Sequence, residues 1–470
     1  MITIASRKDS RLAIFGLGAS GLATGRALVA SGAKVSAWDD DAKRRTAASA
    51  SGMPLIDLYH ATWNRVDALV LAPGIPLTHP APHPVVEIAK KARCPVIGDI
   101  ELFLEATPAA MVIGITGTNG KSTTTALIGH VLRNAGKAVQ IGGNLGTPAL
   151  ALDKLPEDGA YVLELSSYQL DLTDAARFDV AVLVNISPDH LDRHGGMSGY
   201  VAAKRRIFRT RDRDAVQRRK LAQTAIVGMD DSYSREIYDQ LVQEGGWRVV
   251  PISGVRRIEG GVYVIDGLLH DETAGANGPV LDVRNARALP GTHNWQNAAA
   301  AYAAARTAGA SPTDIARGIE TYPGLPHRQE RIAEVQGVTF INDSKATNGD
   351  SAARALACYE AIYWIAGGKP KDDGLGQAVG WLQAVRRAYL IGEAAERFEG
   401  ELAGKVKSRR SGTLAQAMRE AFADARKDNT PGAVVLLSPA CASFDQFANF
   451  EARGEAFRAE VAKIAQEAGT

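Results

Sequence analysis

The sequence predicts an α/β protein of three tandem doubly wound domains: a Rossmann-like N-terminal domain, a P-loop-like central domain with a small β excursion, and a Rossmann-like C-terminal domain. Short apolar runs typical of buried strands alternate with helix-like stretches along the whole chain. Glycine-rich turns at residues 16–21 and 114–120 each follow an apolar run and precede a helix-like stretch. The 470 residues are too many for one hydrophobic core and suit about three domains of ordinary size.

The composition is that of a soluble globular protein, with 46% hydrophobic and 23% charged residues. A formal net charge of +2 gives no general attraction to nucleic acid or membrane. The cysteines Cys94, Cys358 and Cys441 are widely spaced, so neither a disulfide framework nor a structural zinc site is indicated. No signal-like N-terminus and no long apolar run occur, and we expect a cytoplasmic protein.

The first glycine-rich turn belongs to a predicted domain at residues 1–104. A strand at residues 11–15 runs into GLGASG at 16–21, and Asp39 follows a second strand about 20 positions on, as in dinucleotide-binding units. Two more strands are expected within residues 67–76 and 95–102. The pattern alone is compatible with NAD, with another nucleotide diphosphate, or with no ligand.

The second turn, GITGTNGKSTTTA at residues 114–126, predicts a phosphate-binding loop. Backbone N–H groups and the helix N-terminus face the anion, Lys121 neutralises it, and the Ser122 hydroxyl can reach Mg²⁺. The strict GxxxxGK[ST] pattern is not matched, because Ile115 stands where its first glycine would be. An ordinary strand-turn-helix is the alternative, but the context favours ATP.

Two polar strand ends follow the phosphate loop. Glu164 ends the apolar run AYVL, where a carboxylate can hold magnesium, although an edge glutamate in solvent has the same pattern. The next apolar run leads to Asp189, His190, Asp192 and His194, expected in a loop at the carboxyl edge of the sheet. A histidine in such a loop is either a ligand or an ordinary surface residue.

Three further features complete the central domain. The basic run at residues 204–220 is interpreted mainly as a solvated helix face, with an anion or RNA contact as the alternative. Residues 248–285 suggest the small β excursion. Asn294 and Asn297, at the start of an alanine-rich helix, are either capping residues or face a nucleotide.

The C-terminal segment repeats the strand-helix alternation after a Pro- and Gly-containing boundary at residues 322–330. Polar residues stand at its strand ends, where α/β proteins bind ligands. These residues are Asp343, Lys345, Thr347, Lys369, Lys371, Ser438 and Ser443.

Eight motifs in order carry a resemblance to a known family. They are GTNGKST, ELSSYQL, NISPDHLDRH, YVAAKRR, GTHNWQNAAAA, GLPHRQE, FINDSKATN and SPACASFDQF. Together the motifs resemble the Mur ligases of peptidoglycan synthesis over essentially the whole chain. The resemblance implies a UDP-substrate domain at residues 1–104, an ATP-binding domain at 105–324 and an amino-acid-binding domain at 325–470. It also reassigns the first glycine-rich turn from NAD to UDP.

Carried over by position, the resemblance implies a role for each site residue. Lys121, Glu164, His190 and Lys204 would be catalytic. ATP would contact Gly117, Thr118, Asn119, Gly120, Lys121, Ser122, Thr123, Asn297, Arg328 and Asp343. The substrates would contact Ser20, Asp39, Gly74, Asn144, His190, Lys345, Thr347, Lys371, Ser443 and Phe444. Two Mg²⁺ sites would draw on Ser122, Glu164, His190 and Lys204, the last as a carbamate formed with CO₂.

The implied reaction is an ATP-dependent amide ligation through an acyl phosphate. DSKATN and SPACASFDQF favour the members that add D-glutamate to UDP-N-acetylmuramoyl-L-alanine, and we expect a monomer with no nucleic-acid or membrane partner. The alternatives are a sister ligase for another amino acid, a folylpolyglutamate synthase, and a nucleotide-binding regulatory protein that reads RNA through residues 204–220.

Overall fold

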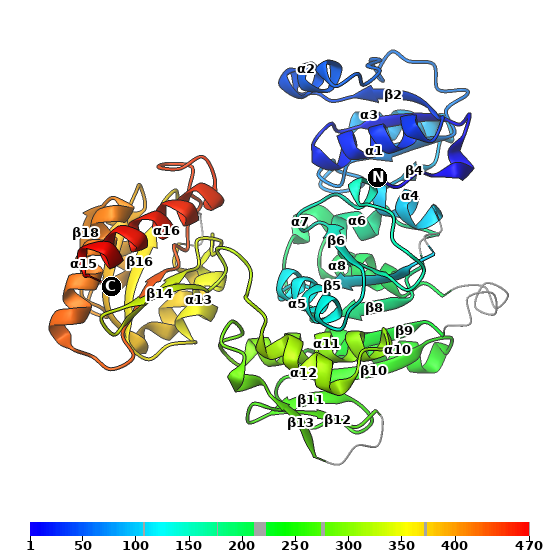
Figure 1. Ribbon diagram of the computed structural model, residues 1–470. Coiled ribbons are helices and arrows are strands. Elements are labelled where there is room, and N and C mark those ends of the chain that lie inside the picture. The colour runs from blue at the N-terminus through cyan, green and yellow to red at the C-terminus, as the bar shows by residue number, and fades with distance from the viewer. Residues whose placement is uncertain (107–108, 176, 211–221, 274–277, 371–373, 470) are drawn as a thin grey trace. The chain divides into compact units, whose positions relative to one another are not determined.

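The structure is a computed structural model that describes residues 1–106, 109–175, 177–210, 222–273, 278–370 and 374–469 (Figure 1). The described chain forms two compact units, and three sheets run through them. The first unit comprises Met1–Asn285 and Asn294–Tyr322, and the second comprises Ala286–His293 and Pro323–Thr470. Each sheet lies within one of the three predicted ranges, which themselves stay predictions. No helix of the described residues is long and apolar enough to cross a membrane.

The first sheet has four parallel strands in the order β2-β1-β3-β4. Its strands are β1 (Arg11–Phe15), β2 (Lys34–Trp38), β3 (Ala68–Leu71) and β4 (Val96–Ile97). Its helices are α1 (Ala19–Ala30), α2 (Ala42–Ala50), α3 (Pro84–Lys91) and α4 (Asp99–Glu105). The predicted doubly wound character is confirmed, since helix-borne apolar residues pack on two separate cores.

The strand predicted within residues 95–102 is much shorter than expected. Only Val96 and Ile97 are extended, and α4 starts at Asp99 after Gly98. Asp99 and Glu101 lie in the first turn of α4, where the helix dipole favours acidic residues. Phe103 of α4 then packs edge-on against Tyr161 of the second sheet, with ring centroids 5.2 Å apart. The apolar run is therefore divided between β4 and α4, and α4 packs on the second sheet and so joins the first two sheets into one unit.

The second sheet has nine strands in the order β13-β12-β11-β10-β9-β8-β5-β7-β6. Its strands are β5 (Met111–Thr116), β6 (Val139–Gly143), β7 (Ala160–Glu164), β8 (Val180–Leu183), β9 (Thr224–Gly228), β10 (Arg248–Ser253), β11 (Val262–Ile265), β12 (Leu268–Asp271) and β13 (Pro279–Asp282). The β11–β12 and β12–β13 pairs are antiparallel, whereas β10 and β11 pair in parallel. The expected β excursion is thus an extension of the central sheet.

Helices follow several strands of the second sheet along the chain. They are α5 (Lys121–Asn134), α6 (Ser167–Asp171), α7 (Leu191–His194), α8 (Met197–Arg205), α10 (Ser232–Glu244), α11 (His293–Thr307) and α12 (Pro312–Glu320). The helix expected through the basic run at residues 204–220 ends at Arg205 and continues as a 3₁₀ turn at Arg206–Phe208. Residues 211–221 lie outside the described part of the chain, so the run's proposed contacts are untested.

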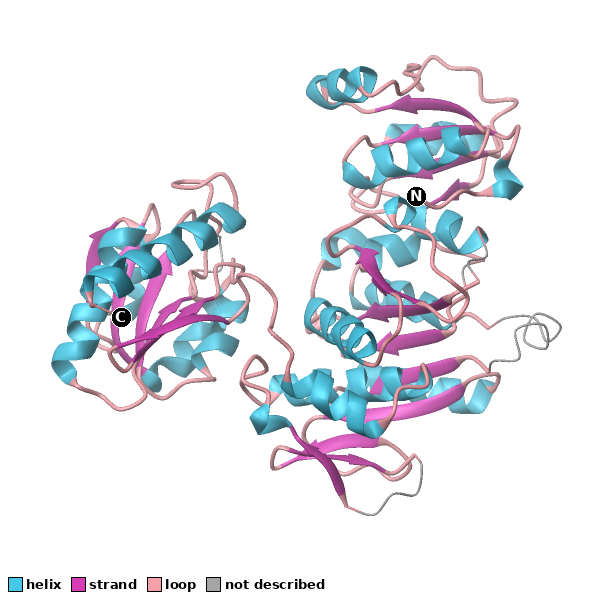
Figure 2. Ribbon diagram, viewed as in Figure 1, coloured by secondary structure: helices cyan, strands magenta, loops and turns pink. Residues whose placement is uncertain are grey.

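The third sheet makes up the core of the second unit, in the order β14-β15-β19-β16-β17-β18. Its strands are β14 (Glu330–Val335), β15 (Val338–Asn342), β16 (Ile362–Gly367), β17 (Val385–Ile391), β18 (Ser408–Gly412) and β19 (Val434–Leu437). Helices α13 (Gly349–Leu356) and α14 (Ala395–Leu402) cover one face, and α15 (Leu414–Asp428) and α16 (Phe450–Glu467) cover the other (Figure 2).

Alternation along β16 explains this two-sided packing. Ile362 and Trp364 point into the core under α13 and α14, whereas Tyr363 and Ile365 point into the core under α15 and α16. Successive residues of a strand face opposite sides of the sheet, so a strand that is apolar at every position requires helices on both faces. The doubly wound class predicted for this segment is confirmed.

Candidate active site

The phosphate loop connects β5 to α5 and needs glycine at two positions. Gly117 and Gly120 have φ angles of 155° and 83°. A Cβ on Gly120 would lie only 2.2 Å from Oδ1 of Asn297. Gly120 caps α5, so Ser122 and Thr123 lie in its first turn, where N–H groups without intrahelical acceptors favour an anion.

The residues after β8 brace this loop. The backbone N–H groups of Thr118 and Asn119 donate to the carbonyl oxygen and to Oδ1 of Asn185, at 2.8 and 2.9 Å. The Thr118 hydroxyl donates to the carbonyl of Ser187 at 3.0 Å. Asn185 was not predicted as a functional residue, although its place directly after an apolar run is the signal that could have found it.

Asn294 and Asn297 lie inside α11 rather than at its cap. Nδ2 of Asn297 donates to Oδ1 of Asn294 at 2.9 Å, and Oδ1 of Asn297 accepts from the Thr124 hydroxyl at 3.2 Å. Both side chains are buried. The capping interpretation is therefore wrong, and Asn297 instead ties α11 to α5 next to Gly120, while its contact with ATP stays a prediction.

Two lysine ammonium groups meet at one carbonyl oxygen of the loop. Nζ of Lys121 donates to the carbonyls of Gly117 and Thr118, at 2.9 and 3.0 Å, and Nζ of Lys204 donates to Gly117 at 2.7 Å. Lys204 is 1% exposed and its Nζ also lies 4.6 Å above the ring of Tyr200. Burial, and then the neighbouring Lys121, hold the pKa of Lys204 well below its usual value.

Glu164 ends β7 as predicted, but it is buried rather than solvated. Its Oε1 accepts from Nδ2 of Asn144 at 2.8 Å. Its Oε2 is buried without a hydrogen-bond partner. A buried carboxylate oxygen without a donor is costly, and a cation at that position would offset the cost. The solvent-exposed alternative for Glu164 is thus wrong.

These residues fit a magnesium ion that is shared with phosphate oxygens. Mg²⁺ commonly takes one or two protein ligands and completes its shell with water and phosphate. Within the described ranges no group of three or more His, Cys, Asp and Glu side chains is arranged to hold a metal by itself. Glu164 and the Ser122 hydroxyl offer oxygen ligands of the kind that Mg²⁺ prefers, and their metal role stays a prediction.

The loop after β8 holds His190 in a left-handed conformation, with a φ of 51°. Its side chain is half exposed, and Nε2 lies 3.4 Å from Oδ2 of Asp189. His194 lies on α7 and is buried, with Nε2 2.9 Å from Oγ of Ser167, so it is no loop ligand. Burial lowers the pKa of His194. In the described chain no hydrogen bond links His190 to the two lysines or to Glu164, and its metal role stays a prediction.

The glycine turn of the first sheet is held by Asp39. Oδ2 of Asp39 accepts from the N–H of Leu17 at 2.6 Å, and Oδ1 accepts from the N–H of Asp41 at 2.8 Å. The hydroxyl of Ser20 donates to Oδ2 of Asp99 at 2.6 Å. Both predicted substrate contacts therefore bond within the protein, and Asp99, which sequence reasoning missed, fixes the start of α1.

Replacing Gly21 by alanine is expected to lower the free energy of unfolding by about 1–3 kcal/mol, because its Cβ would lie 1.9 Å from the carbonyl oxygen of Gly16. Gly400 of α14 is the matched control, since it also lies inside a helix and a Cβ there meets nothing within 4 Å. Urea unfolding checks both variants. Equal stability of the Gly21→Ala and Gly400→Ala proteins would show that the close approach to Gly16 is not what requires glycine at residue 21.

The second unit gathers polar side chains at the carboxyl ends of β15 and β19. Oδ1 of Asp343 accepts from the N–H of Gln329 at 3.1 Å, and Oδ2 accepts from the Ser438 hydroxyl at 2.9 Å. Burial raises the pKa of Asp343 to about 7, and Ser438 opposes this shift. Parallel pairing of β15 and β19 explains why residues so distant in the sequence meet.

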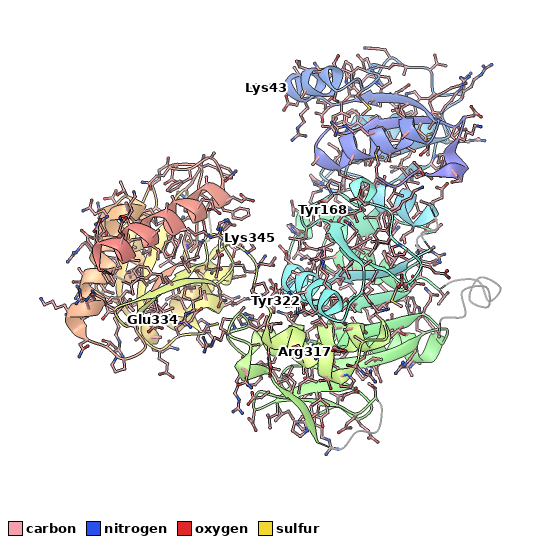
Figure 3. The ribbon with its side chains drawn as sticks, viewed as in Figure 1. Lys43, Tyr168, Arg317, Tyr322, Glu334 and Lys345 are labelled. Carbon is pink, nitrogen blue, oxygen red and sulfur yellow. The ribbon has the colours of Figure 1, made fainter. Side chains whose placement is uncertain are left out.

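The other predicted residues of this unit differ in their contacts and in their exposure to solvent. Nζ of Lys345, labelled in Figure 3, lies 5.2 Å from the ring centroid of Phe450. Thr347 donates its N–H to the carbonyl of Lys345 at 2.9 Å. Ser443 is buried, whereas Phe444 is 69% exposed. Lys371 lies outside the described residues, and Arg328 has a buried Nε without a partner.

Two known family domains match most of this chain. Its residues 115–305 match the Mur ligase middle domain, and residues 327–441 match the Mur ligase, glutamate ligase domain. The chain belongs to the Mur ligase family, as the resemblance of its motifs implied.

Two relatives with high identity over nearly the whole chain carry the same enzyme name. The UDP-N-acetylmuramoylalanine--D-glutamate ligase of Phenylobacterium zucineum is 50% identical to this chain. The aligned region covers 99% of this chain and 98% of that ligase. The ligase of the same name from Rhodospirillum rubrum is 53% identical, covering 97% and 94%. The full-length match includes the first sheet, which the two family domains do not cover.

Solved structures agree with the fold. UDP-N-acetylmuramate-alanine ligase from Thermotoga maritima has a TM-score of 0.58 at 15% identity, covering 97% of this chain and 99% of its own. MurF from Acinetobacter baumannii has a TM-score of 0.56 at 21% identity, covering 98% and 93%. At such identities these likenesses support the shared architecture alone.

Proposed function

We propose that this protein joins D-glutamate to UDP-N-acetylmuramoyl-L-alanine in the cytoplasm, with ATP converted to ADP and phosphate. One observation carries the chemistry: Lys121 and the buried Lys204 converge on a phosphate loop, and Glu164 nearby has a buried oxygen without a partner. The substrates come from the name of relatives that are about half identical over nearly the whole chain.

An unreactive carboxylate must be activated before an amine can displace its oxygen. An oxygen of the muramoyl-alanine carboxylate attacks the γ-phosphorus of ATP, and ADP leaves with the bonding electrons. The amine of glutamate attacks the carbonyl carbon of this acyl phosphate, loses a proton, and phosphate leaves. We assign to Lys121 the role of offsetting charge on the transferring phosphoryl group.

Magnesium, when bound, would polarise the phosphate oxygens and neutralise their charge. We assign Ser122 and Glu164 to one site. His190 and the carbamate of Lys204 are assigned to a second site. Burial favours the neutral amine of Lys204, which can attack CO₂; the new N–C bond forms as a proton leaves, and the cation becomes an anion.

The polar strand ends of the second unit suit an amino acid with two carboxylates. Lys345 and Lys371 supply positive charge, and Thr347 and Ser443 supply hydroxyl donors. Phe444 is the exposed apolar residue of this group. Contacts of Arg328 and Asp343 with ATP belong to the same proposal.

Phosphate release by the purified protein tests this function. The assay contains ATP, Mg²⁺ and UDP-N-acetylmuramoyl-L-alanine, with D-glutamate, L-glutamate, L-alanine, glycine or diaminopimelate offered separately. We expect release with D-glutamate alone. Release with another amino acid would overturn the substrate assignment, and no release with any would favour a nucleotide-binding protein without ligase activity.

A further inference from the structure

Arg193 of α7 connects the two sheets of the first unit. Its Nη1 donates to the carbonyl oxygen of Gly74 at 3.1 Å, and Gly74 lies in the loop that follows β3. Its Cζ lies 4.5 Å from the ring centroid of Tyr168, which belongs to α6. One planar side chain thus contacts the loop that follows β3 of the first sheet and, through an aromatic ring, the helix α6 that follows β7 of the second sheet.

Tyr168, labelled in Figure 3, is a common platform for the α7 region. Its ring centroid lies 5.1 Å from that of His190 and 5.6 Å from that of His194. His194 is in turn anchored through Nε2, 2.9 Å from the Ser167 hydroxyl. The ring of Tyr168 therefore fixes His190 and Arg193 relative to each other.

The loop after β3 is also pressed against the end of α7 at a second point. Gly195 has a φ of 67°, and a Cβ on it would lie 2.5 Å from Nε2 of His79. A side chain at Gly195 would displace this histidine. The hydrogen bond from Arg193 to Gly74 holds this loop beside α7, and the close approach of His79 to Gly195 is a second sign that the two segments pack together.

We propose that Arg193 is a positioning residue that fixes the Gly74 loop at a set distance from His190. This inference rests on the proposed function, and on the substrate contacts of Gly74 and His190 that the family resemblance implies. A ligand that spans two sheets binds well only if they keep their spacing before it arrives. Arg193 itself need not touch the substrate, since it acts through the loop and through Tyr168.

Kinetic separation of binding from chemistry tests this role. Arg193→Ala should raise the KM for UDP-N-acetylmuramoyl-L-alanine about tenfold, the loss expected for one charge-assisted hydrogen bond and one cation–π contact. We expect kcat and the KM for ATP to change less than about threefold. Arg193→Lys keeps the charge but loses the planar fork, so its KM should fall between those of wild type and Arg193→Ala.

Arg235 offers a matched control, because its Nη1 also donates to one carbonyl, that of Met229, at 3.1 Å. Arg235→Ala should leave all three kinetic parameters unchanged. In a double-mutant cycle, Tyr168→Leu and Arg193→Ala should be less than additive in their effects on the same KM, because each removes the same contact.

Amide hydrogen exchange separates this inference from the proposed function, since it needs no substrate. In the free protein, Arg193→Ala should speed exchange in residues 72–80, and Arg235→Ala should not. Faster exchange in a protein without ligase activity would keep the positioning role and overturn the proposed function. An active enzyme with unchanged exchange and unchanged KM in Arg193→Ala would overturn the positioning role.

Discussion

Replacing Lys204 by alanine is expected to lower kcat by about 10²–10³-fold. Lys204 is buried against the phosphate loop and donates to the carbonyl of Gly117. As a carbamate it would supply the negative oxygens that a second magnesium ion needs. The variant removes both the charge and the oxygens while leaving the first-turn N–H groups of α5 in place. Steady-state phosphate release measures the loss.

Chemical rescue makes this prediction specific. A short carboxylate such as formate or acetate should restore part of the Lys204→Ala activity, because it can occupy the space of the missing carbamate. Wild-type activity should fall in CO₂-free buffer and return with bicarbonate. Failure of the carboxylate to rescue, together with indifference to CO₂, would refute the carbamate.

A folding defect is not expected for the Lys204 variants. Without the carbamate, the folded protein disfavours the charged form of Lys204, so the pKa of Lys204 is lowered and the resulting destabilisation is fully present below that folded-state pKa. That destabilisation disappears as pH rises past the unfolded-state pKa of the lysine. Lys204→Met should therefore melt no lower than wild type at neutral pH, although it is as inactive as Lys204→Ala.

Replacing Lys121 by alanine is expected to lower kcat by about 10³-fold or more. Nζ of Lys121 lies against the carbonyls of Gly117 and Thr118, at the N-terminus of α5 where phosphate is expected. Phosphoryl transfer spreads negative charge over the phosphate oxygens, and a lysine ammonium group beside the loop stabilises that charge. The KM for ATP should rise as well. Single-turnover formation of ADP measures the chemical step directly.

Lys137, just beyond the C-terminus of α5, is the control for Lys121. Lys137→Ala removes the same charge at the opposite end of the same helix, away from the loop, and it should behave as wild type. Lys121→Arg should stay strongly impaired, because a planar guanidinium does not reproduce a compact ammonium. Activity of Lys121→Ala within about tenfold of wild type would contradict the role assigned to this residue.

Local sequence determined the elements that carry the site. The apolar run before Gly114 and the glycines after it predict β5, the loop and α5, because strand burial, left-handed turns and helix capping act over a few residues. The same reasoning found the GLGASG turn and the strand end at Glu164. Family motifs then assigned roles to residues whose local patterns left alternatives open.

The sequence was least reliable where one apolar run suits two structures. Residues 95–102 have the pattern of a strand, yet their second half, from Asp99, begins α4, whose Phe103 packs on Tyr161. The burial of Ile100, Leu102 and Phe103 follows from a neighbouring sheet that no local pattern contains. The basic run showed the same limit, since buried Lys204 begins a segment whose pattern is that of a solvated face.

By itself, then, the sequence determined the strand-helix order, the phosphate loop and the family of this protein. Only the tertiary structure decided that Lys204 meets Gly117 across 87 positions and that Thr124 meets Asn297 across 173. It also decided that Glu164 keeps a buried oxygen without a partner and that Arg193 reaches Gly74. The reason is physical: propensities and turns depend on near neighbours, whereas parallel strand order and burial bring together side chains whose separation in the chain carries no signal.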